Sequence, residues 1–177
     1  MTKSFYITSK SLDENLEFEE DIKKYGSSKE SLYLVESTGD QIKIGFNGKL
    51  KCKNSDNKIE FLENELIIND FVWNWAEGIA FKLPKLITGE KISLTTYVYS
   101  LKIDIEPLGK NVKLNFSGFV KGEFIADFDE FVSESFSFLD KFVNHLLKMN
   151  PKLIQHKIFL NIVEGRDKIK QMLRERK

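Results

Sequence analysis

The sequence predicts an α+β fold in which an antiparallel sheet, built as a meander with hairpins, carries two main amphipathic helices on one face. Residues 128–149 have the pattern of a long amphipathic helix, and residues 91–127 contain four strand-like runs separated by turns. The order along the chain is strands, helix, meander, helix, which favours helices packed against one face of an antiparallel sheet. We expect one domain over residues 1–177, with residues 152–177 as a C-terminal helical extension.

The N-terminal part is predicted to begin with a short strand at residues 4–9. Phe18, Ile22 and Tyr25 then recur at helical spacing and Gly26 can end a helix, which predicts a short helix over about 13–25. An acidic run with no basic residue inside it occupies the same stretch: Asp13, Glu14, Glu17, Glu19, Glu20 and Asp21. Most such runs are solvated surface, but a dense carboxylate face also suits the capture of a basic partner.

From residue 31 onward, apolar and polar residues alternate, which predicts strands at 31–35 and 41–46 with a turn at Gly39-Asp40. Asn47-Gly48 lies between the second of these strands and another alternating run, 49–53. Because both residues tolerate the positive φ angles of a type I′ turn, the pair predicts a hairpin between those two runs. A further short strand is expected at 59–62.

The next element is predicted to be a helix over residues 66–83. Its apolar side chains recur with a period of 3.6 residues at Ile68, Phe71, Val72, Trp75, Ile79 and Leu83. Asn69 or Asp70 can cap the N-terminus of this helix. Pro84 is expected to end or kink it, and Gly89 marks the exit.

Trp73 and Phe81 fall on the opposite face of that helix, and two interpretations are open. In the first, the helix is sandwiched between the sheet and another segment, so that both of its faces are buried. In the second, Trp73 and Phe81, with Asn74 and Glu77 between them, form an exposed aromatic anchor for a protein partner. The first is favoured, because a chain of 177 residues has further segments that can cover the helix.

The meander strands are expected at 91–99, 101–106, 112–117 and 122–127. The helix over 128–149 then places most of its large apolar side chains on one side. These are Phe128, Phe131, Val132, Phe138, Leu139, Phe142, Val143, Leu146 and Met149. Asn150-Pro151 should stop this helix, because proline disfavours the helical conformation of the residue before it.

The charge balance excludes some classes of partner. Lys plus Arg and Asp plus Glu are equal at 27 each, so the chain as a whole has no field that would attract nucleic acid or an anionic membrane. The single Cys52 excludes an intramolecular disulfide, and no signal-like or membrane-spanning apolar run occurs. We therefore expect a cytoplasmic protein, and its Lys-, Asn-, Ile- and Phe-rich composition is typical of an AT-rich bacterial genome.

For each residue that could carry catalytic or metal chemistry, a structural role is favoured. His145 lies at the edge of the apolar stripe, His156 in a polar stretch typical of the surface, and Cys52 in a predicted strand. The helix dipole and the N-cap favour acidic residues where this chain has them, at Asp127, Asp129, Glu130 and Glu134. The sequence contains no paired-cysteine, HExxH or phosphate-loop motif. We expect no catalytic residue, metal or cofactor.

Three stretches carry a resemblance of pattern that covers roughly residues 60–150. They are PheValTrpAsnTrpAlaGlu at 71–77, GlyGluPheIleAlaAspPheAspGluPhe at 122–131, and the Phe-rich helix that follows. In this order of elements the chain resembles the small bacterial immunity proteins of polymorphic or contact-dependent toxin systems. The resemblance implies a tight, non-catalytic binder that blocks a cognate toxin. The neutral net charge departs from the acidic balance that such proteins often show against nucleases, so the class of toxin stays open.

The expected function is therefore a non-catalytic protein-binding domain, immunity-like, whose partner is a protein such as a toxin domain. The predicted partner-binding residues are Glu17, Glu20, Asp21, Trp73, Asn74, Glu77 and Phe81. One alternative is a small ligand-binding or enzymatic domain with a pocket near Asp127, Glu130 and His145. Another is a structural subunit that forms a homodimer through an exposed helix face.

Overall fold

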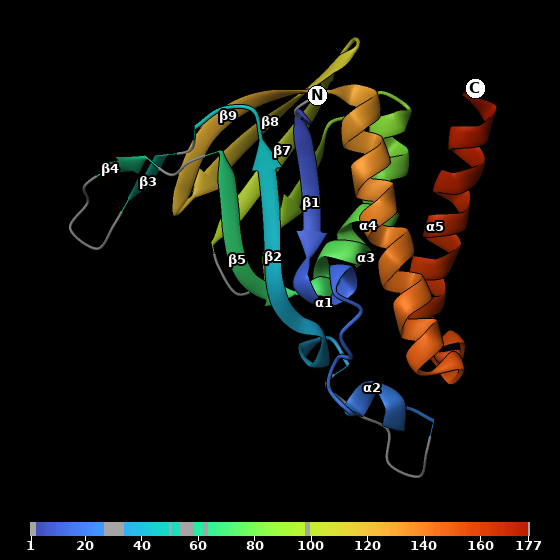
Figure 1. The fold of residues 1–177 in the computed structure, drawn as a ribbon. Coiled ribbons are helices and arrows are strands. Elements are labelled where there is room, and N and C mark those ends of the chain that lie inside the picture. The colour runs from blue at the N-terminus through green and yellow to red at the C-terminus, as the bar shows by residue number, and fades with distance from the viewer. Residues whose placement is uncertain are drawn as a thin grey trace.

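In the computed structural model the chain folds into two antiparallel sheets and a layer of helices beside them (Figure 1). The structure describes residues 3–26, 34–49, 51–53, 59–61, 64–97 and 100–176, with only the backbone of Asp21, 51–53 and 59–61. The strands are β1 (Phe5–Ser9), β2 (Gly39–Phe46), β3 (Lys51–Lys53), β4 (Ile59–Phe61), β5 (Glu65–Phe71), β6 (Ile92–Thr95), β7 (Leu101–Leu108), β8 (Asn111–Gly118) and β9 (Val120–Asp127). The helices are α1 (Lys10–Asp13), α2 (Asp21–Lys24), α3 (Val72–Ile87), α4 (Phe128–Met149) and α5 (Lys157–Glu175), with 3-10 turns at Glu36–Thr38 and Pro151–Gln155. The predicted α+β class is confirmed.

The smaller sheet has the strand order β1-β2-β5, and all of its pairs are antiparallel. Ile7, Ile44 and Leu66 are paired across the three strands and are buried, whereas Ile67, on the opposite face of β5, is exposed. This alternation follows from the two-residue period of a strand with one solvated face.

The larger sheet has the order β4-β3-β9-β8-β7-β6, in which β6 to β9 form the predicted meander. Its inward positions are filled by β-branched, leucine and phenylalanine side chains, among them Ile105, Val112 and Phe116. The two sheets meet where the ring of Phe46, at the end of β2, lies 4.3 Å from the ring of Phe124 and 5.6 Å from that of Phe116. The two inner faces therefore share one aromatic core.

The helices pack on one another and on these inner faces. α4 lies along β1, where the rings of Phe131 and Phe5 are 4.6 Å apart, and α3 packs between α4, α5 and β6. α5 is the outermost helix and packs mainly on α3 (Figure 1). The C-terminal segment 152–177 therefore adds buried residues to the core, including Phe159, Ile162 and Ile169.

The meander and α4 follow the sequence prediction closely. α4 begins at Phe128 and ends at Met149, as expected, and Asp127 caps it by accepting a hydrogen bond of 2.9 Å from the Glu130 N–H. Asn150 ends α4, also as expected. The turn predicted over 107–111 is shorter, because β7 continues to Leu108 and only Gly109 and Lys110 lie between β7 and β8. Strand β9 begins earlier than predicted, at Val120. The first meander strand was predicted over 91–99, but β6 covers only Ile92–Thr95, and residues 98 and 99 lie outside the described residues.

The prediction of one helix over 13–25 is wrong. The chain forms two single turns, α1 and α2, separated by an irregular stretch. Three apolar residues at helical spacing are too few to sustain a helix through so many adjacent carboxylates, because short helices are marginal without a packed face. Of the strand predicted at 31–35, residues 31–33 lie outside the described residues, and Leu34 and Val35 form a turn. Gly39-Asp40 is not a turn but the start of β2.

The hairpin prediction at Asn47-Gly48 is also wrong. β2 pairs with β1 and β5, whereas β3 pairs with β4 and β9, so this segment carries the chain from one sheet to the other. A Cβ atom on Gly48 would lie 2.3 Å from the ring of Phe124. Glycine is therefore needed here because the backbone passes directly over an aromatic ring of the core, and not because of a two-residue turn.

The predicted helix over 66–83 contains two elements. Residues Glu65–Phe71 form β5, and α3 begins only at Val72. Neither Asn69 nor Asp70 caps α3; instead the Trp73 N–H donates a 3.0 Å hydrogen bond to the hydroxyl of Thr38, which is distant in sequence. The periodicity misled because Ile68 fits a helical stripe as well as the strand alternation in which Leu66, Ile68 and Asp70 are buried. Phe71 fits only the helical stripe, because in the strand it lies on the face opposite Ile68.

Pro84 does not end or kink α3, which continues to Ile87. Proline has no N–H to donate to the carbonyl of Ala80, four residues earlier, so the usual helical hydrogen bond to that oxygen is missing. The carbonyl faces Gly165 of α5, where a Cβ atom would lie 2.8 Å from the Ala80 oxygen. The proline in α3 and the glycine in α5 together mark a close crossing of the two helices.

Candidate binding surfaces

Trp73 of α3 lies in the core, against α4, α5 and the residue that caps α5. Its side chain is 1 % exposed, and its ring lies 5.7 Å from those of Phe159 and His156 and 6.0 Å from that of Phe142. Trp73 is therefore covered as the first interpretation expected, and the covering segments are α4 and α5. In this structure Trp73 is not available to a partner at the surface.

Asn74, Glu77 and Phe81 lie along the outer side of α3, at the i, i+3 and i+7 positions that share one helical face. Phe81 is 42 % exposed. With Leu94 and Thr95 of β6 these residues line a hollow of about 200 Å³. We call the surface formed by Asn74, Glu77 and Phe81 the α3 face; it contains three of the predicted partner-binding residues.

Polar side chains of α3 hold the edge strand β6 against the helix. The Asn74 amide donates a 3.0 Å hydrogen bond to the Thr95 carbonyl, and the Lys82 ammonium donates to the Ser93 carbonyl. These contacts satisfy carbonyl groups that an edge strand would otherwise present to solvent. They also tie β6 to α3 along the hollow, whose lining residues come from both elements.

Asp70 extends this fixed region to Tyr97. The buried Asp70 carboxylate accepts hydrogen bonds from the Phe71 N–H at 2.8 Å, the Trp75 indole N–H at 3.0 Å and the Tyr97 N–H at 3.2 Å. The Tyr97 ring is 65 % exposed and lies 5.1 Å from the ring of Phe71. Tyr97 is a surface aromatic residue that the sequence reasoning missed, because it falls at the end of a predicted strand.

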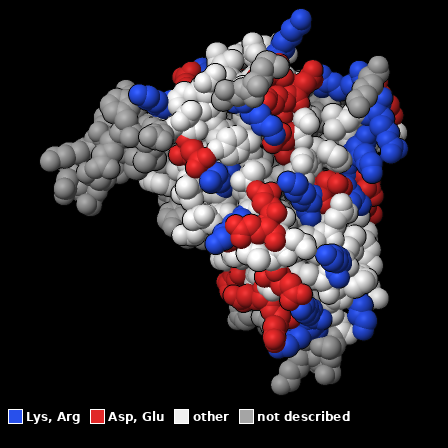
Figure 2. Space-filling view, in the orientation of Figure 1, with Lys and Arg blue, Asp and Glu red and all other residues white. Residues whose placement is uncertain are grey.

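The acidic run lies around α1 and α2, where acidic side chains gather on the surface with lysines beside them (Figure 2). Glu17 pairs with Lys23 at 2.5 Å and Glu20 with Lys24 at 3.1 Å, so two of the predicted partner-binding carboxylates have partners within the chain. Asp21 begins α2, and its side chain is outside the described part of the structure.

The acidic run and the α3 face are held by different parts of the fold. The amide of Asn150, at the end of α4, donates to the carbonyls of Ile22 and Tyr25 at 2.9 and 3.0 Å, which fixes α2 below α4. The α3 face is instead fixed to β6. Of the predicted residues, Glu17 and Glu20 therefore belong to a region held by α4, and the α3 face to a region held by β6, whereas Trp73 lies in the core.

The residues of the enzymatic alternative do not converge. Asp127 caps α4 and Glu130 accepts a 2.8 Å hydrogen bond from the Ser4 N–H, which joins α4 to β1. His145 follows Glu130 by fifteen residues on the same helix, about 22 Å at the helical rise. Its ring packs edge-on against Phe18 at 5.3 Å. The structure gives no common pocket to these three side chains.

His156 is not the surface residue that the sequence suggested. Its Nδ1 accepts a 3.3 Å hydrogen bond from the Phe159 N–H, which makes it the N-cap of α5. Its ring is half-buried between Tyr25 and Trp73, at 5.4 and 5.7 Å. A capping imidazole with aromatic neighbours has a structural role, and the polar sequence around it gave no sign of that role.

Two shifted pKa values have structural causes. Burial, followed by the hydrogen bond that Tyr6 donates to Glu65, raises the pKa of Tyr6 to about 12. The hydrogen bond from Lys23 lowers the pKa of Glu17. Both shifts favour the state that the group already has at neutral pH, so neither group is tuned for proton transfer near pH 7.

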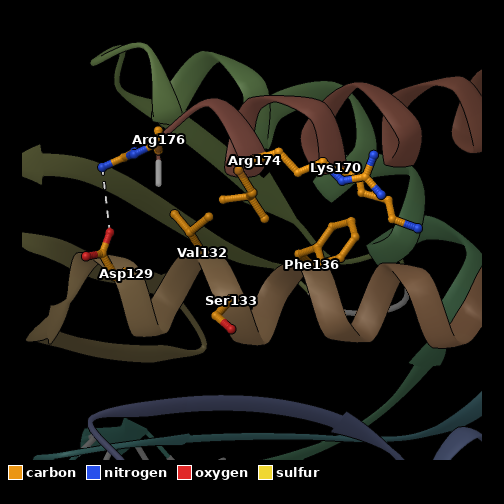
Figure 3. A pocket seen from close by; sticks show the side chains of 8 residues that line it. Asp129, Val132, Ser133, Phe136, Lys170, Arg174 and Arg176 are labelled. Atoms are coloured by element: carbon orange, nitrogen blue, oxygen red, sulfur yellow. Dashed lines mark ion pairs between the residues drawn. The ribbon is translucent and has the colours of Figure 1, made fainter.

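A second hollow lies between the N-terminal half of α4 and the C-terminal half of α5, with a volume of about 580 Å³ (Figure 3). We call it the α4–α5 groove. Its lining residues are Asp129, Val132, Ser133 and Phe136 of α4, and Lys170, Leu173, Arg174 and Arg176 at the end of the chain. Arg176 lies 3.6 Å from the Asp129 carboxylate and 5.0 Å above the Phe128 ring. None of these residues was predicted as a site.

Comparison with known proteins adds no assignment: no family model, no curated protein and no solved structure matches the chain. Within the described ranges, no three His, Cys, Asp or Glu side chains are grouped as a metal site would require. None of the helices that the structure describes combines the length and the apolar character needed to cross a membrane.

Proposed function

We propose that the chain is a non-catalytic protein-binding domain and, in the specific form that its sequence resembles, an inhibitor that binds a cognate bacterial toxin in the cytoplasm. The observation that carries the binding function is the α3 face. There, the half-exposed Phe81 stands beside a hollow whose walls are fixed by hydrogen bonds between α3 and β6. Tyr97 adds a second exposed ring near the first turn of the same helix.

This arrangement has the features of a binding hot spot. An aromatic side chain on a rigid helix loses little conformational freedom on binding, and the neighbouring hollow can accept an apolar side chain of the partner. Asn74 and Glu77 place polar groups at its rim, where partner hydrogen bonds fix orientation. Trp73 belongs to the support of this surface and not to the surface itself.

The acidic run gives the proposal a second, electrostatic part. Glu14 and Glu19 are exposed beside the paired Glu17 and Glu20, and together they would attract a basic partner over a distance of about 10 Å at moderate salt. We expect this patch to raise the association rate and the α3 face to hold the complex.

The test begins with affinity capture by the tagged full-length chain from the native bacterial lysate, with mass spectrometry to identify any stoichiometric partner. The affinity of the purified pair is then measured for Phe81→Ala and for the matched control Ile125→Ala, an exposed apolar residue on β9 far from α3 in the sheet order. Phe81→Ala should weaken binding about tenfold or more, whereas Ile125→Ala should leave it unchanged.

The inhibitor form of the proposal needs its own readout. The captured partner is expressed with and without the chain, and cell growth is measured. Growth arrest that wild type relieves and Phe81→Ala relieves less would support a toxin inhibitor. Equal affinity of the Phe81→Ala and wild-type proteins for the partner would refute the α3 face as the binding surface, and a partner without toxicity would refute the inhibitor form alone.

A further inference from the structure

The α4–α5 groove has the spacing of a helix-binding site. From α4, residues 129, 132, 133 and 136 face it, which is the i, i+3, i+4, i+7 stripe of a helix; from α5, residues 170, 173 and 174 give the matching stripe. Because α5 packs mainly on α3, its C-terminal half leaves space beside α4 (Figures 1 and 3). The α4 stripe runs for about 10 Å, or two helical turns, and the α5 stripe for about 6 Å, or one turn.

The floor of the groove is apolar and its rim is basic. Val132, Phe136 and Leu173 provide the floor, and Figure 3 shows Val132 and Phe136 directed from α4 towards α5. Three cationic side chains line the groove against one carboxylate, and that carboxylate, Asp129, is paired with Arg176. No carboxylate in the described part of the chain pairs with Lys170 or Arg174.

We propose that the α4–α5 groove binds an amphipathic helix of a protein partner, with an apolar stripe flanked by acidic side chains. The apolar stripe would rest on Phe136 and Leu173, and carboxylates one turn apart would reach Lys170 and Arg174, which are themselves one turn apart on α5. Two antiparallel helices with facing stripes accept a third helix by the packing that forms small bundles. The site is separate from the α3 face and does not depend on the proposal made for it.

The probe is a synthetic peptide of about four helical turns, with leucines along one stripe and glutamates on both flanks, labelled for fluorescence anisotropy. Two control peptides share its length: in one, every glutamate is replaced by lysine; in the other, the leucines are replaced by serine. Each is titrated with the full chain at low and at moderate salt. The acidic peptide alone should bind, and its affinity should fall as salt rises.

Two double variants of the chain then locate the site. Lys170→Glu with Arg174→Glu should weaken the acidic peptide about tenfold or more. Lys157→Glu with Lys168→Glu is the matched control, because it reverses two exposed charges on the same helix outside the groove. It should change the affinity less than about twofold, and far-UV circular dichroism should show that both variants keep the wild-type helix content.

Three outcomes would overturn the proposal: no binding of the acidic peptide, equal binding of the lysine peptide, and equal loss of affinity in the two double variants. If the acidic peptide does not bind, dodecanoate is titrated next, and binding that depends on Lys170 and Arg174 would assign the groove to a small anionic amphiphile. The peptide controls test charge complementarity even if the groove variant is misfolded.

Discussion

Trp73 and Trp75 provide a matched pair of substitutions whose expected effects on stability differ. Both side chains are buried in the first turn of α3, and replacement by Phe removes the same atoms at each position. The two indole N–H groups differ. That of Trp75 donates to the buried Asp70 carboxylate at 3.0 Å, whereas that of Trp73 is buried without an acceptor among the described residues.

The expected difference follows from these two environments. The packing loss of a Trp→Phe change, about 1–2 kcal/mol, is common to both sites and largely cancels in the comparison. Trp75→Phe also loses a hydrogen bond to a charged acceptor, about 1.5–3 kcal/mol. Trp73→Phe instead removes an unpaired buried donor, which relieves about 1–3 kcal/mol. We expect Trp75→Phe to be more destabilising than Trp73→Phe by roughly 3–6 kcal/mol.

Equilibrium urea denaturation measures this difference directly. The chain has two tryptophans, so each variant keeps one, whose fluorescence reports unfolding beside far-UV circular dichroism. Equal midpoints for the two variants, with equal slopes, would refute the reasoning, because the Trp73 N–H would then have a partner as valuable as Asp70. A lower midpoint for Trp73→Phe than for Trp75→Phe would refute it more strongly.

Three further predictions follow from single contacts. Gly165→Ala should destabilise the protein by about 1–3 kcal/mol in thermal unfolding, because the new Cβ would lie 2.8 Å from the Ala80 oxygen. This cost exceeds the gain of about 1 kcal/mol from the better helix propensity of alanine. A gain in stability would contradict the close crossing of α3 and α5. Asn150→Ala should cost about 2 kcal/mol and speed amide hydrogen exchange around α2, and unchanged exchange there would contradict its role as the link to α4. The pKa of Tyr6 is raised from 10.0 to about 12, so the stability of wild type relative to Tyr6→Phe should be constant below pH 10 and fall as the pH rises through 12. Denaturation of both proteins at each pH measures this difference in unfolding free energy, and a difference that does not change with pH would contradict the prediction.

The elements that could be predicted well from the sequence are those whose local pattern of apolar and polar residues is strong. α4 has the predicted bounds because its apolar stripe, its acidic N-cap and the Asn150-Pro151 stop all agree. The meander was predictable for the same reason, since alternation and glycine turns coincide there.

The elements that were mispredicted depend on contacts between distant segments. β5 is a strand because it pairs with β2, and the Thr38 hydroxyl, distant in sequence, contributes to the start of α3. No window of sequence around Ile68 contains that information. Similarly, Gly48 is required by the ring of Phe124, so a local turn signal was assigned to the wrong cause.

The candidate surfaces show the same limit. The helical wheel placed Asn74, Glu77 and Phe81 on one face, which the structure has, but it could not tell that α5 would cover Trp73 and leave Phe81 exposed. The α4–α5 groove was not predictable, because its two stripes become neighbours only when α5 folds back beside α4.

Part of the charge in the α4–α5 groove follows from helix ends alone. α4 begins where α5 ends, so the acidic first turn of one meets the basic last turn of the other, and the two helix dipoles favour Asp129 and Arg174 at those places. This effect is worth about 0.3–1 kcal/mol per charge and does not extend beyond the terminal turn. Lys170 lies one turn before the end of α5 and gains nothing from it.

Arg174→Glu should therefore lower the free energy of unfolding by about 1 kcal/mol in urea denaturation, and Lys170→Glu should leave it unchanged. Both substitutions should weaken the binding of the acidic peptide. If Lys170→Glu binds the peptide as well as wild type does, the basic side chains of the groove stabilise the end of α5 and do not bind a ligand.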